Sequence, residues 1–312
     1  MGRMRRRKKL VKSKRMILFS IIIIIIGCVS AYAAYQYQQG VSLAGKDRFK
    51  DDEQAAKAFE GADVKFGKIN VLLLGSDTRG EEHARTDTIM IAHYDQENHQ
   101  SKLISIMRDT YVNIPGHGKQ KINAAYAYGG PELLRKTIKE NFDVDINYYA
   151  VVDFEGFSKI ADIIAPNGIE VDVPYEMSYG IGTTIEPGIQ TLNGDKLLGY
   201  VRFRHDKLSD FGRVQRQQEV IGKLKDEAMS MGNILKLPKI LGVVDPYIDT
   251  NLDTPTLLSL GKDLLTNRSN DLRTLRIPVQ DSYTDERFGG VGAVLSINLD
   301  QNKSVLDKFL AS

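Results

Sequence analysis

The chain is poor in cysteine, because Cys28 is the only one among its 312 residues. A single cysteine excludes an intramolecular disulfide framework, a Cys-x-x-Cys redox pair and a zinc site built from several cysteines. The five histidines show no His-Glu-x-x-His spacing. A Walker A loop, a Rossmann fingerprint and a Gly-x-Ser-x-Gly elbow are also missing. These absences argue against P-loop, dinucleotide-binding and serine-hydrolase chemistry.

Acidic residues are missing from residues 1–15, which contain nine lysines and arginines. The formal charge of +2 therefore hides a split, since the rest of the chain holds 33 basic and 40 acidic residues. Nonspecific nucleic-acid binding requires a basic face that displaces counterions. An acidic body of this kind predicts no nucleic-acid partner.

Charge is absent from residues 16–34, which include the isoleucine run Ile21–Ile26. About 20 apolar residues cross a bilayer as a helix, and the basic residues before it stay in the cytoplasm. We expect a signal anchor over 16–36 that follows a cytoplasmic tail over 1–15, which is single-pass type II topology at the cell membrane. A cleaved signal peptide is the alternative, because Ala31-Tyr32-Ala33 resembles a cleavage site. Both interpretations place the body outside the cell.

The remaining sequence predicts a linker over 37–65, with a short helix around 53–59, and one domain over 66–312. The apolar run at 69–74 indicates a buried strand, and the runs at 88–94 and 103–107 indicate a hairpin. Helical and strand patterns then alternate, which predicts an α/β domain with a mixed central sheet flanked by helices. The other expected elements are strands over 149–152, 169–173 and 273–279 and helices over 131–141, 154–164, 193–202, 213–231 and 304–310.

Charged residues stand at the ends of the predicted strands. Asp77 follows the first strand and Asp87 begins the second, so the two carboxylates would meet if these strands are neighbours. A pair of carboxylates with room for water and substrate oxygens suits Mg²⁺, although aspartate is also a common turn residue. Arg108 directly follows the third strand. It could hold a phosphate through two hydrogen bonds or form an internal salt bridge.

Basic residues cluster further along the chain, where four arginines occur within 15 residues: Arg202, Arg204, Arg213 and Arg216. On a helix that begins at residue 213, Arg213 and Gln217 lie on the apolar stripe. A polar first turn on a buried face, at the positive end of a helix dipole, favours an anion, although a solvated basic helix start is the alternative. Carboxylates for Mg²⁺ and arginines for phosphates together predict a pyrophosphate site.

The stretches 70–77, 85–88, 105–109 and 202–218 resemble the LytR-CpsA-Psr family over nearly the whole chain. The most specific of them is Arg-Phe-Arg-His at 202–205, followed by Asp210 and by Arg-Val-Gln-Arg-Gln-Gln at 213–218. The resemblance implies a phosphotransferase of cell-wall assembly in a Gram-positive bacterium. Its donor would be a glycopolymer, wall teichoic acid or a related anionic polymer, on undecaprenyl pyrophosphate. Its acceptor would be the 6-hydroxyl of N-acetylmuramic acid in peptidoglycan.

The resemblance also implies the roles of individual residues. Asp77 and Asp87 would bind Mg²⁺ or Mn²⁺, and Asp210, Arg213 and Arg108 would be catalytic, with Asp210 orienting or deprotonating the acceptor hydroxyl. The residues that bind pyrophosphate would be Arg79, Arg85, Arg108, Arg202, Arg204, Arg213 and Gln217. An apolar tunnel between sheet and helices would enclose the prenyl tail. Two alternatives stay open, a non-catalytic polyprenyl-phosphate-binding or regulatory module and a pyrophosphate hydrolase.

Overall fold

The computed structural model describes residues 30–42, 58–76, 86–229, 237–266 and 272–312. Within these ranges no helix is both long and apolar enough to cross a membrane. Most of the predicted membrane segment, residues 16–29, lies outside the described residues.

A six-stranded mixed sheet forms the centre of the domain, with the strand order β10-β3-β2-β1-β6-β9. β1, β2 and β3 form an antiparallel meander, while β6 runs parallel to β1 and β10 runs parallel to β3. The bounds are β1 Lys68–Ser76, β2 Thr86–Asp95, β3 Gln100–Ile106, β6 Tyr148–Asp153, β9 Ile248–Thr250 and β10 Arg273–Ile277. The predicted hairpin, the strand over 149–152 and the mixed sheet are confirmed.

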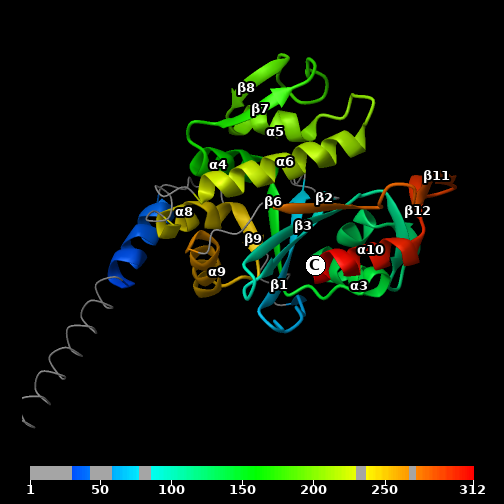
Figure 1. Cartoon of the computed structure of the whole chain (residues 1–312), viewed down its shortest axis with the longest axis horizontal. Coiled ribbons are helices and arrows are strands. Elements are labelled where there is room, and N and C mark those ends of the chain that lie inside the picture. The colour runs from blue at the N-terminus through cyan, green and yellow to red at the C-terminus, as the bar shows by residue number, and fades with distance from the viewer. Residues whose placement is uncertain (1–29, 43–57, 77–85, 230–236, 267–271) are drawn as a thin grey trace, which may run out of the picture.

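Helices cover both faces of this sheet (Figure 1). On one face lie α3 Asn123–Phe142 and α10 Leu299–Ala311, and on the other lie α4 Phe154–Ile164 and α6 Asp210–Ala228. The core under α3 joins the fully buried Leu72 and Ile104 of the sheet to Leu134 and Ile138 of α3. Burial on both faces explains why these strands read as continuous apolar runs.

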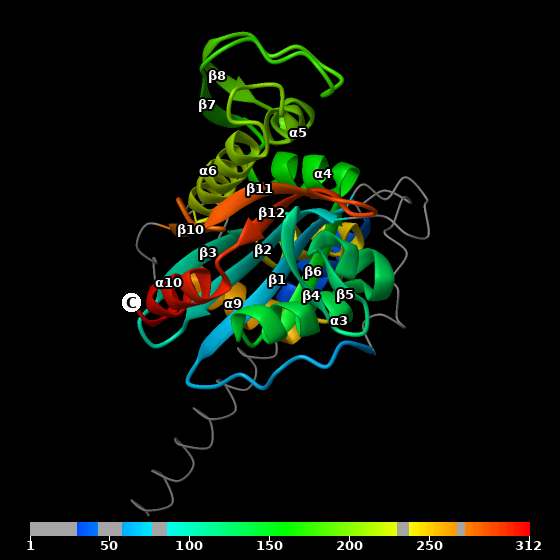
Figure 2. The same ribbon diagram turned by 90° about the vertical axis from the view of Figure 1, so that its right-hand side faces the viewer.

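A smaller unit stands beyond α6, as Figure 2 shows at its top. It contains the hairpin of β7 Ile169–Val173 and β8 Gly188–Leu192, together with α5 Gly194–Arg202. Val171, Leu197 and Val220 belong to one buried cluster, so α6 fastens this unit to the domain. The sequence predicted β7, α5 and α6, but α6 begins three residues earlier than expected, at Asp210.

Several elements were not predicted. A second sheet has the order β11-β12-β4-β5, with bounds β4 Thr110–Ile114, β5 Gly118–Lys121, β11 Tyr283–Phe288 and β12 Gly292–Ile297. β11 is exposed along almost its whole length, so no hydrophobic period marks it. The short elements α8 Leu237–Val244, η1 Asp245–Tyr247 and α9 Thr254–Thr266 were missed as well.

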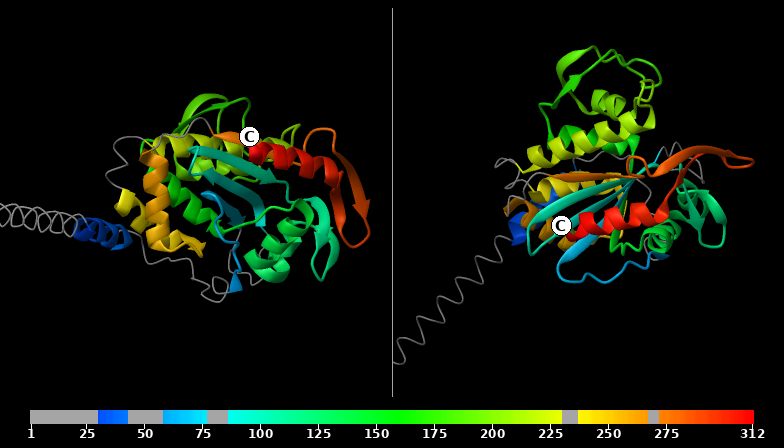
Figure 3. Two further views of the ribbon diagram at one scale, coloured as in Figure 1. Left: turned by 60° about the horizontal axis from the view of Figure 1, so that its bottom comes forward. Right: turned by 45° about the vertical axis from the view of Figure 1, so that its right-hand side comes forward.

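A helix over residues 30–42 packs against α8, as the blue and yellow ribbons of Figure 3 show. A Cβ atom at Gly40 would lie 2.2 Å from the Lys239 carbonyl oxygen, and one at Gly242 would lie 2.2 Å from the Tyr37 carbonyl oxygen. The two backbones therefore touch, and this contact requires glycine on both helices. The helices cross at these two glycines. Any larger residue at either position would push the helices apart.

The predicted linker also joins the body at its other described end. The ring centroid of Phe59 lies 4.9 Å from that of Tyr149, and Phe59 is buried in the main core. The Ala62 amide donates a hydrogen bond of 2.9 Å to the Ile146 carbonyl oxygen. Phe59 therefore contacts β6 and Ala62 contacts the segment just before it, and these contacts have no periodic signature in the sequence.

A buried histidine on β2 predicts a dependence of stability on pH. His93 is 4% exposed and its Nδ1 lies 2.8 Å from Asn70 Oδ1. Burial, with Lys102 and Lys68 outweighing Asp95, lowers the pKa of His93 to about 4. An unfolded histidine titrates near 6.5, so the folded state loses stability as the pH falls from about 6.5 to 4, by up to about 1.4 kcal/mol per pH unit. Urea denaturation at several pH values measures this slope.

The control for this prediction is His93→Gln, which retains a donor for Asn70 but does not titrate. We expect the part of the slope that comes from His93 to disappear in this variant. An unchanged slope between pH 6.5 and 4 would show that His93 does not cause the dependence.

Candidate functional site

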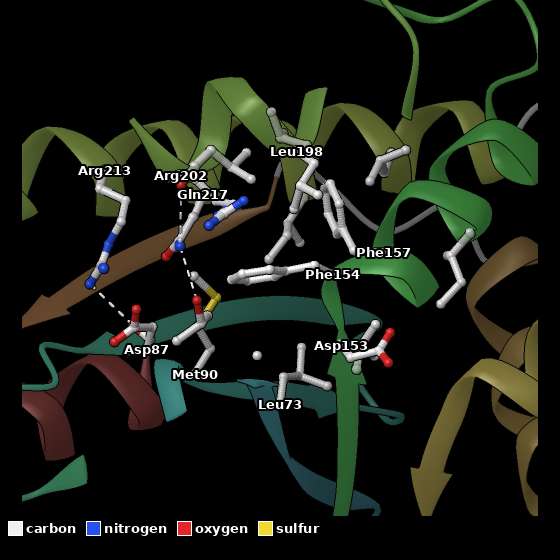
Figure 4. Close-up of a pocket in the computed structure, with 18 of the residues that line it drawn as sticks. Leu73, Asp87, Met90, Asp153, Phe154, Phe157, Leu198, Arg202, Arg213 and Gln217 are labelled. Carbon is white, nitrogen blue, oxygen red and sulfur yellow. Dashed lines mark hydrogen bonds between the residues drawn. The ribbon is translucent and has the colours of Figure 1, made fainter. Parts of the chain in front are cut away.

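A cavity of about 590 Å³ lies between α4, α6 and the central sheet (Figure 4). The sheet provides Leu73, Met90 and Val152 to its wall, and the helices provide mainly apolar side chains: Phe154, Phe157, Ile160 and Ile164 from α4 and Val220, Ile221, Leu224 and Ala228 from α6. Ionic and polar residues also line it: Asp87, Arg202, Arg204, His205, Arg213 and Gln217. The cavity thus joins an apolar lining to a cluster of arginines.

The start of α6 places Arg213 and Gln217 inside this cavity, as the helical stripe predicted. Gln217 Nε2 donates to Thr88 Oγ1 at 2.9 Å. Arg213 is only 3% exposed, and its Nη2 donates to the Asp87 carbonyl and to Asp210 Oδ2, each at 3.1 Å. Its Nε has no hydrogen-bond partner among the described residues. A buried donor without a partner is costly, so Arg213 has an N–H group to offer to a ligand.

Three carboxylates and four cations, Arg213 among them, form one network in the described part of the chain. Arg108 lies at its centre, with Nη1 2.6 Å from Asp87 Oδ1 and Nε 3.1 Å from Asp210 Oδ2. Asp109 accepts from both Arg108 and Lys121. Arg204 is held loosely, 3.8 Å from Asp87 and 3.7 Å from Asp210. Cations outnumber carboxylates in this network even before Arg202 is counted.

The ionisation of Asp87 follows from this network. Burial acts to raise the pKa of Asp87, but Arg108, Arg213 and Arg204 outweigh it and hold the pKa below its usual value. Burial opposes the charge of Arg108 too, and Asp87 and Asp210 raise the pKa of Arg108 above its usual value. Burial lowers the pKa of Arg213. Asp87 is therefore an ionised carboxylate at neutral pH.

The end of the sheet where β1 stops and β2 begins offers oxygen atoms, which are the ligands that a hard cation such as Mg²⁺ prefers. β1 ends at Ser76 opposite Thr86, which confirms that the strands before Asp77 and around Asp87 are neighbours. Among the described residues no three potential metal-binding side chains cluster, but Mg²⁺ takes one or two carboxylates and completes its shell with substrate phosphates. Asp87 Oδ2 lies 3.8 Å from Arg204 Nη2, and the buried Ser76 hydroxyl has no described hydrogen-bond partner.

Other predicted residues fall in different places. Asp77, Arg79 and Arg85 lie outside the described residues. Arg202 is the last residue of α5, and its guanidinium stacks 4.0 Å from the centre of the Phe154 ring at the cavity wall. Arg202 and Phe154 come from separate segments, so this cation–π contact could not be found from sequence spacing.

The inclusion of Arg216 in the anion cluster was wrong. Arg216 is buried, donates through Nε to the Tyr200 carbonyl at 3.1 Å and through Nη2 to the Phe203 carbonyl, and pairs with Asp206 Oδ2 at 2.8 Å. Carbonyl groups at the end of a helix have no intrahelical N–H donor, and Arg216 donates hydrogen bonds to two such carbonyls at the end of α5. It therefore ties α6 to the segment that carries Arg204, and it is not part of the cavity lining.

This tie predicts a large loss of stability for Asp206→Ala. The Asp206 side chain is 3% exposed, and it also accepts a hydrogen bond from the Tyr175 hydroxyl at 2.6 Å. Its removal leaves a buried guanidinium without its counter-ion, so we expect the free energy of unfolding to fall by about 2–4 kcal/mol. Chemical denaturation measures this loss. The control is Asp226→Ala, whose side chain is 77% exposed and should change stability by less than about 0.5 kcal/mol. Equal losses in both variants would contradict the assignment.

The chain is similar in sequence to a known protein family and to several of its members. A model of the LytR_cpsA_psr family matches residues 32–304. Regulatory protein MsrR of Staphylococcus aureus strain COL is 42% identical over 279 residues, which cover 89% of this chain and 84% of that protein. The polyisoprenyl-teichoic acid–peptidoglycan teichoic acid transferase TagU of Bacillus cereus strain AH820 is 32% identical over 257 residues, 80% of this chain and 84% of that protein.

Solved structures show the same fold. TagV of B. subtilis superposes with a TM-score of 0.67 at 29% identity, over 80% of this chain and 99% of that one. YwtF (TagT) with bound octaprenyl pyrophosphate lipid superposes with a TM-score of 0.60 at 26% identity, over 80% of this chain and 94% of that one.

Proposed function

The chain belongs to the LytR-CpsA-Psr family, and from that premise we propose that it is a phosphotransferase of cell-wall assembly. It moves a glycopolymer, wall teichoic acid or a related anionic polymer, from a polyprenyl pyrophosphate to the N-acetylmuramic acid of peptidoglycan. The reaction forms a phosphodiester and leaves a polyprenyl phosphate.

One observation carries this proposal, the union of a mainly apolar cavity of about 590 Å³ with a cluster of arginines, of which Arg213 is buried. An amphiphile with a long hydrocarbon tail and a pyrophosphate head matches both parts. Arg213 has an unsatisfied buried donor, which a phosphate oxygen would satisfy. The TagT structure with an octaprenyl pyrophosphate lipid supports the same class of ligand by analogy.

The arginines would act on the charge of the pyrophosphate. Arg213, Arg204 and Arg108 lie together around Asp87, so they can donate to oxygens of both phosphates as negative charge moves toward the leaving group. The other proposed ligands of the pyrophosphate are Arg79, Arg85, Arg202 and Gln217. A Mg²⁺ or Mn²⁺ ion held by Asp77 and Asp87 would supply further charge neutralisation when it is bound.

The acceptor hydroxyl would attack the phosphorus that carries the sugar. The new bond joins that phosphorus to the hydroxyl oxygen, and the bond to the bridging oxygen breaks, so that the polyprenyl phosphate leaves with the electron pair. Asp210, whose side chain is 15% exposed at the centre of the arginines, would orient the hydroxyl and receive its proton. We propose that Asp210, Arg213 and Arg108 are the catalytic residues.

A type II anchor over residues 16–36 would hold this domain at the outer face of the cell membrane. A donor confined to the same bilayer then meets the enzyme at high effective concentration. The domain arrangement proposed with it is a tail over 1–15, a linker over 37–65 and the catalytic domain over 66–312.

The test is transfer by the purified full chain in detergent. A radiolabelled lipid-linked glycopolymer should become attached to peptidoglycan with Mg²⁺ present and remain lipid-linked with EDTA. Failure to transfer, with a donor and an acceptor that a known transferase accepts, would overturn the proposal. Equal release of free polymer phosphate with and without peptidoglycan would identify a hydrolase instead.

A regulatory module is the second candidate, which the name of the relative MsrR favours. Complementation of a deletion strain separates it from the transferase. The double variant Asp77→Ala/Asp87→Ala should fail to complement if the protein is an enzyme and should complement fully if it acts only by binding.

A further inference from the structure

We infer that Tyr179 and His205 form a sugar-binding subsite at the rim of the cavity, for the first pyranose of the donor glycopolymer. The inference rests on the proposed function and adds to it a position for the sugar. Both residues line the cavity, and neither has a part in binding the pyrophosphate or the acceptor above. We call this pair the aromatic rim.

The aromatic rim is a contact between two rings on separate segments. The ring centroids of Tyr179 and His205 lie 4.2 Å apart with an interplanar angle of 73°. The Tyr179 side chain is nonetheless 70% exposed. The pair therefore presents aromatic surface to solvent at the edge of a cavity, and such a surface next to a pocket is a feature of binding sites.

The loop that carries Tyr179 is held in place on both sides. Met177 and Ile185 exchange two backbone hydrogen bonds of 2.9 Å, and both side chains are fully buried. Ile181 is buried in the same cluster, and Gly180 and Gly182 adopt φ values of +76° and +75°, which favour glycine. Tyr179 is thus exposed between buried neighbours, so its ring is prepositioned and loses little entropy on binding.

The path of the donor leads past this rim. The prenyl tail would occupy the apolar part of the cavity, and the phosphates would contact Arg204 and Arg213. His205 directly follows Arg204 in the chain, so the group bonded to the outer phosphate emerges beside the two rings. A pyranose stacks its C–H face on an aromatic ring while its hydroxyls stay in water. Its covalent link to the pyrophosphate raises its effective concentration at the rim.

Other occupants suit the rim less well. A phosphate gains little from Tyr179, because the phenol ring supplies no positive charge. Two rings are also far smaller than a stable protein interface, which buries about 800 Å² on each partner. The sugar of the acceptor has the same stacking chemistry, so the experiment must distinguish it from the sugar of the donor.

The experiment compares two lipids on the full chain in detergent. One is undecaprenyl pyrophosphate, and the other is undecaprenyl pyrophosphate bearing one N-acetylhexosamine. We expect Tyr179→Ala to weaken binding of the sugar-bearing lipid about tenfold, the equivalent of one aromatic contact of about 1.4 kcal/mol. Binding of the bare lipid should change less than twofold. Tyr179→Phe and His205→Phe should bind both lipids like the wild type, because stacking needs only the ring.

The matched control is Tyr128→Ala. Tyr128 is also an exposed tyrosine against a histidine, with its ring centroid 4.5 Å from that of His117, but it does not line the cavity. It should leave both affinities unchanged. Equal loss of both lipids in Tyr179→Ala would overturn the subsite.

Two further results are informative. Unchanged lipid binding in Tyr179→Ala, with a raised KM for peptidoglycan, would assign the rim to the acceptor and overturn the donor subsite. If the wild type binds neither lipid, the proposed function fails, and the subsite fails with it. The subsite is supported only if the wild type binds both lipids and Tyr179→Ala binds the sugar-bearing lipid more weakly. This binding result does not depend on whether the transfer reaction takes place.

Discussion

Replacing Arg213 by alanine is expected to lower the rate of glycopolymer transfer about a thousandfold. Arg213 donates to the Asp87 backbone carbonyl and to the Asp210 carboxylate, and its Nε has no hydrogen-bond partner among the described residues. A buried donor that stabilises charge in the transition state contributes on the order of 10²–10³ in rate, and the loss of the guanidinium removes several donors at once. Initial rates with saturating peptidoglycan measure the effect.

Arg213→Lys distinguishes charge from geometry. Lysine keeps the positive charge but lacks the planar fork that contacts two oxygens, so we expect a loss of about a hundredfold. The matched control is Arg135→Ala on α3, which breaks an ion pair of 2.6 Å with Glu132 far from the cavity lining and should leave the rate within about twofold. If Arg213→Ala and Arg135→Ala behave alike while both remain folded, the role of Arg213 is refuted.

Filling the apolar part of the cavity is expected to produce the second large effect. Ile160 of α4 lines the cavity and is not part of the buried clusters around it. Ile160→Trp therefore occupies space that a prenyl tail would take. Each methylene excluded from an apolar site costs about 0.8 kcal/mol, so exclusion of about four carbons weakens the binding of undecaprenyl pyrophosphate about 200-fold.

Chain length makes this result specific. A geranyl pyrophosphate, which needs little of the cavity, should lose less than about threefold, whereas loss of head-group binding would affect both lipids equally. The control is Ile189→Trp on β8, at a side chain that is 73% exposed. Equal weakening of short and long lipids by Ile160→Trp would show that the apolar cavity does not hold the tail.

The parts of the fold that sequence patterns predicted are those buried on both sides or on one defined stripe. β3 is buried at six of its seven positions, and the α6 stripe that contains Arg213 and Gln217 lines the cavity. β11 and β5 consist mainly of polar or exposed residues, and backbone hydrogen bonds pair them with other strands. Backbone pairing has no residue preference strong enough to show in such short segments.

Sequence patterns likewise predicted part of the candidate site and missed another part. Arg108 and Asp87 lie at strand ends, Arg213 and Gln217 lie on one face of α6, and Arg204 lies in the connection before α6; these five residues come together. Arg216 was grouped with them because sequence clustering cannot show that the carbonyls of Tyr200 and Phe203 occupy its guanidinium. Tyr179 was missed because its contact with His205 joins two loops. Gly180 and Gly182, which follow Tyr179 in the chain, were the one available signal.

The contact between Gly40 and Gly242 would limit how far the domain could move from the proposed membrane anchor. A flexible linker of the length of residues 37–65 would allow excursions of about 30 Å. Two backbones that touch remove most of this freedom, because the helix over 30–42 cannot swivel on α8 without losing the contact. In a protein anchored before this helix, the domain would keep a fixed distance and orientation relative to the anchor. Its working radius, and so the layer of cell wall within its reach, would be set by the rigid dimensions of the domain.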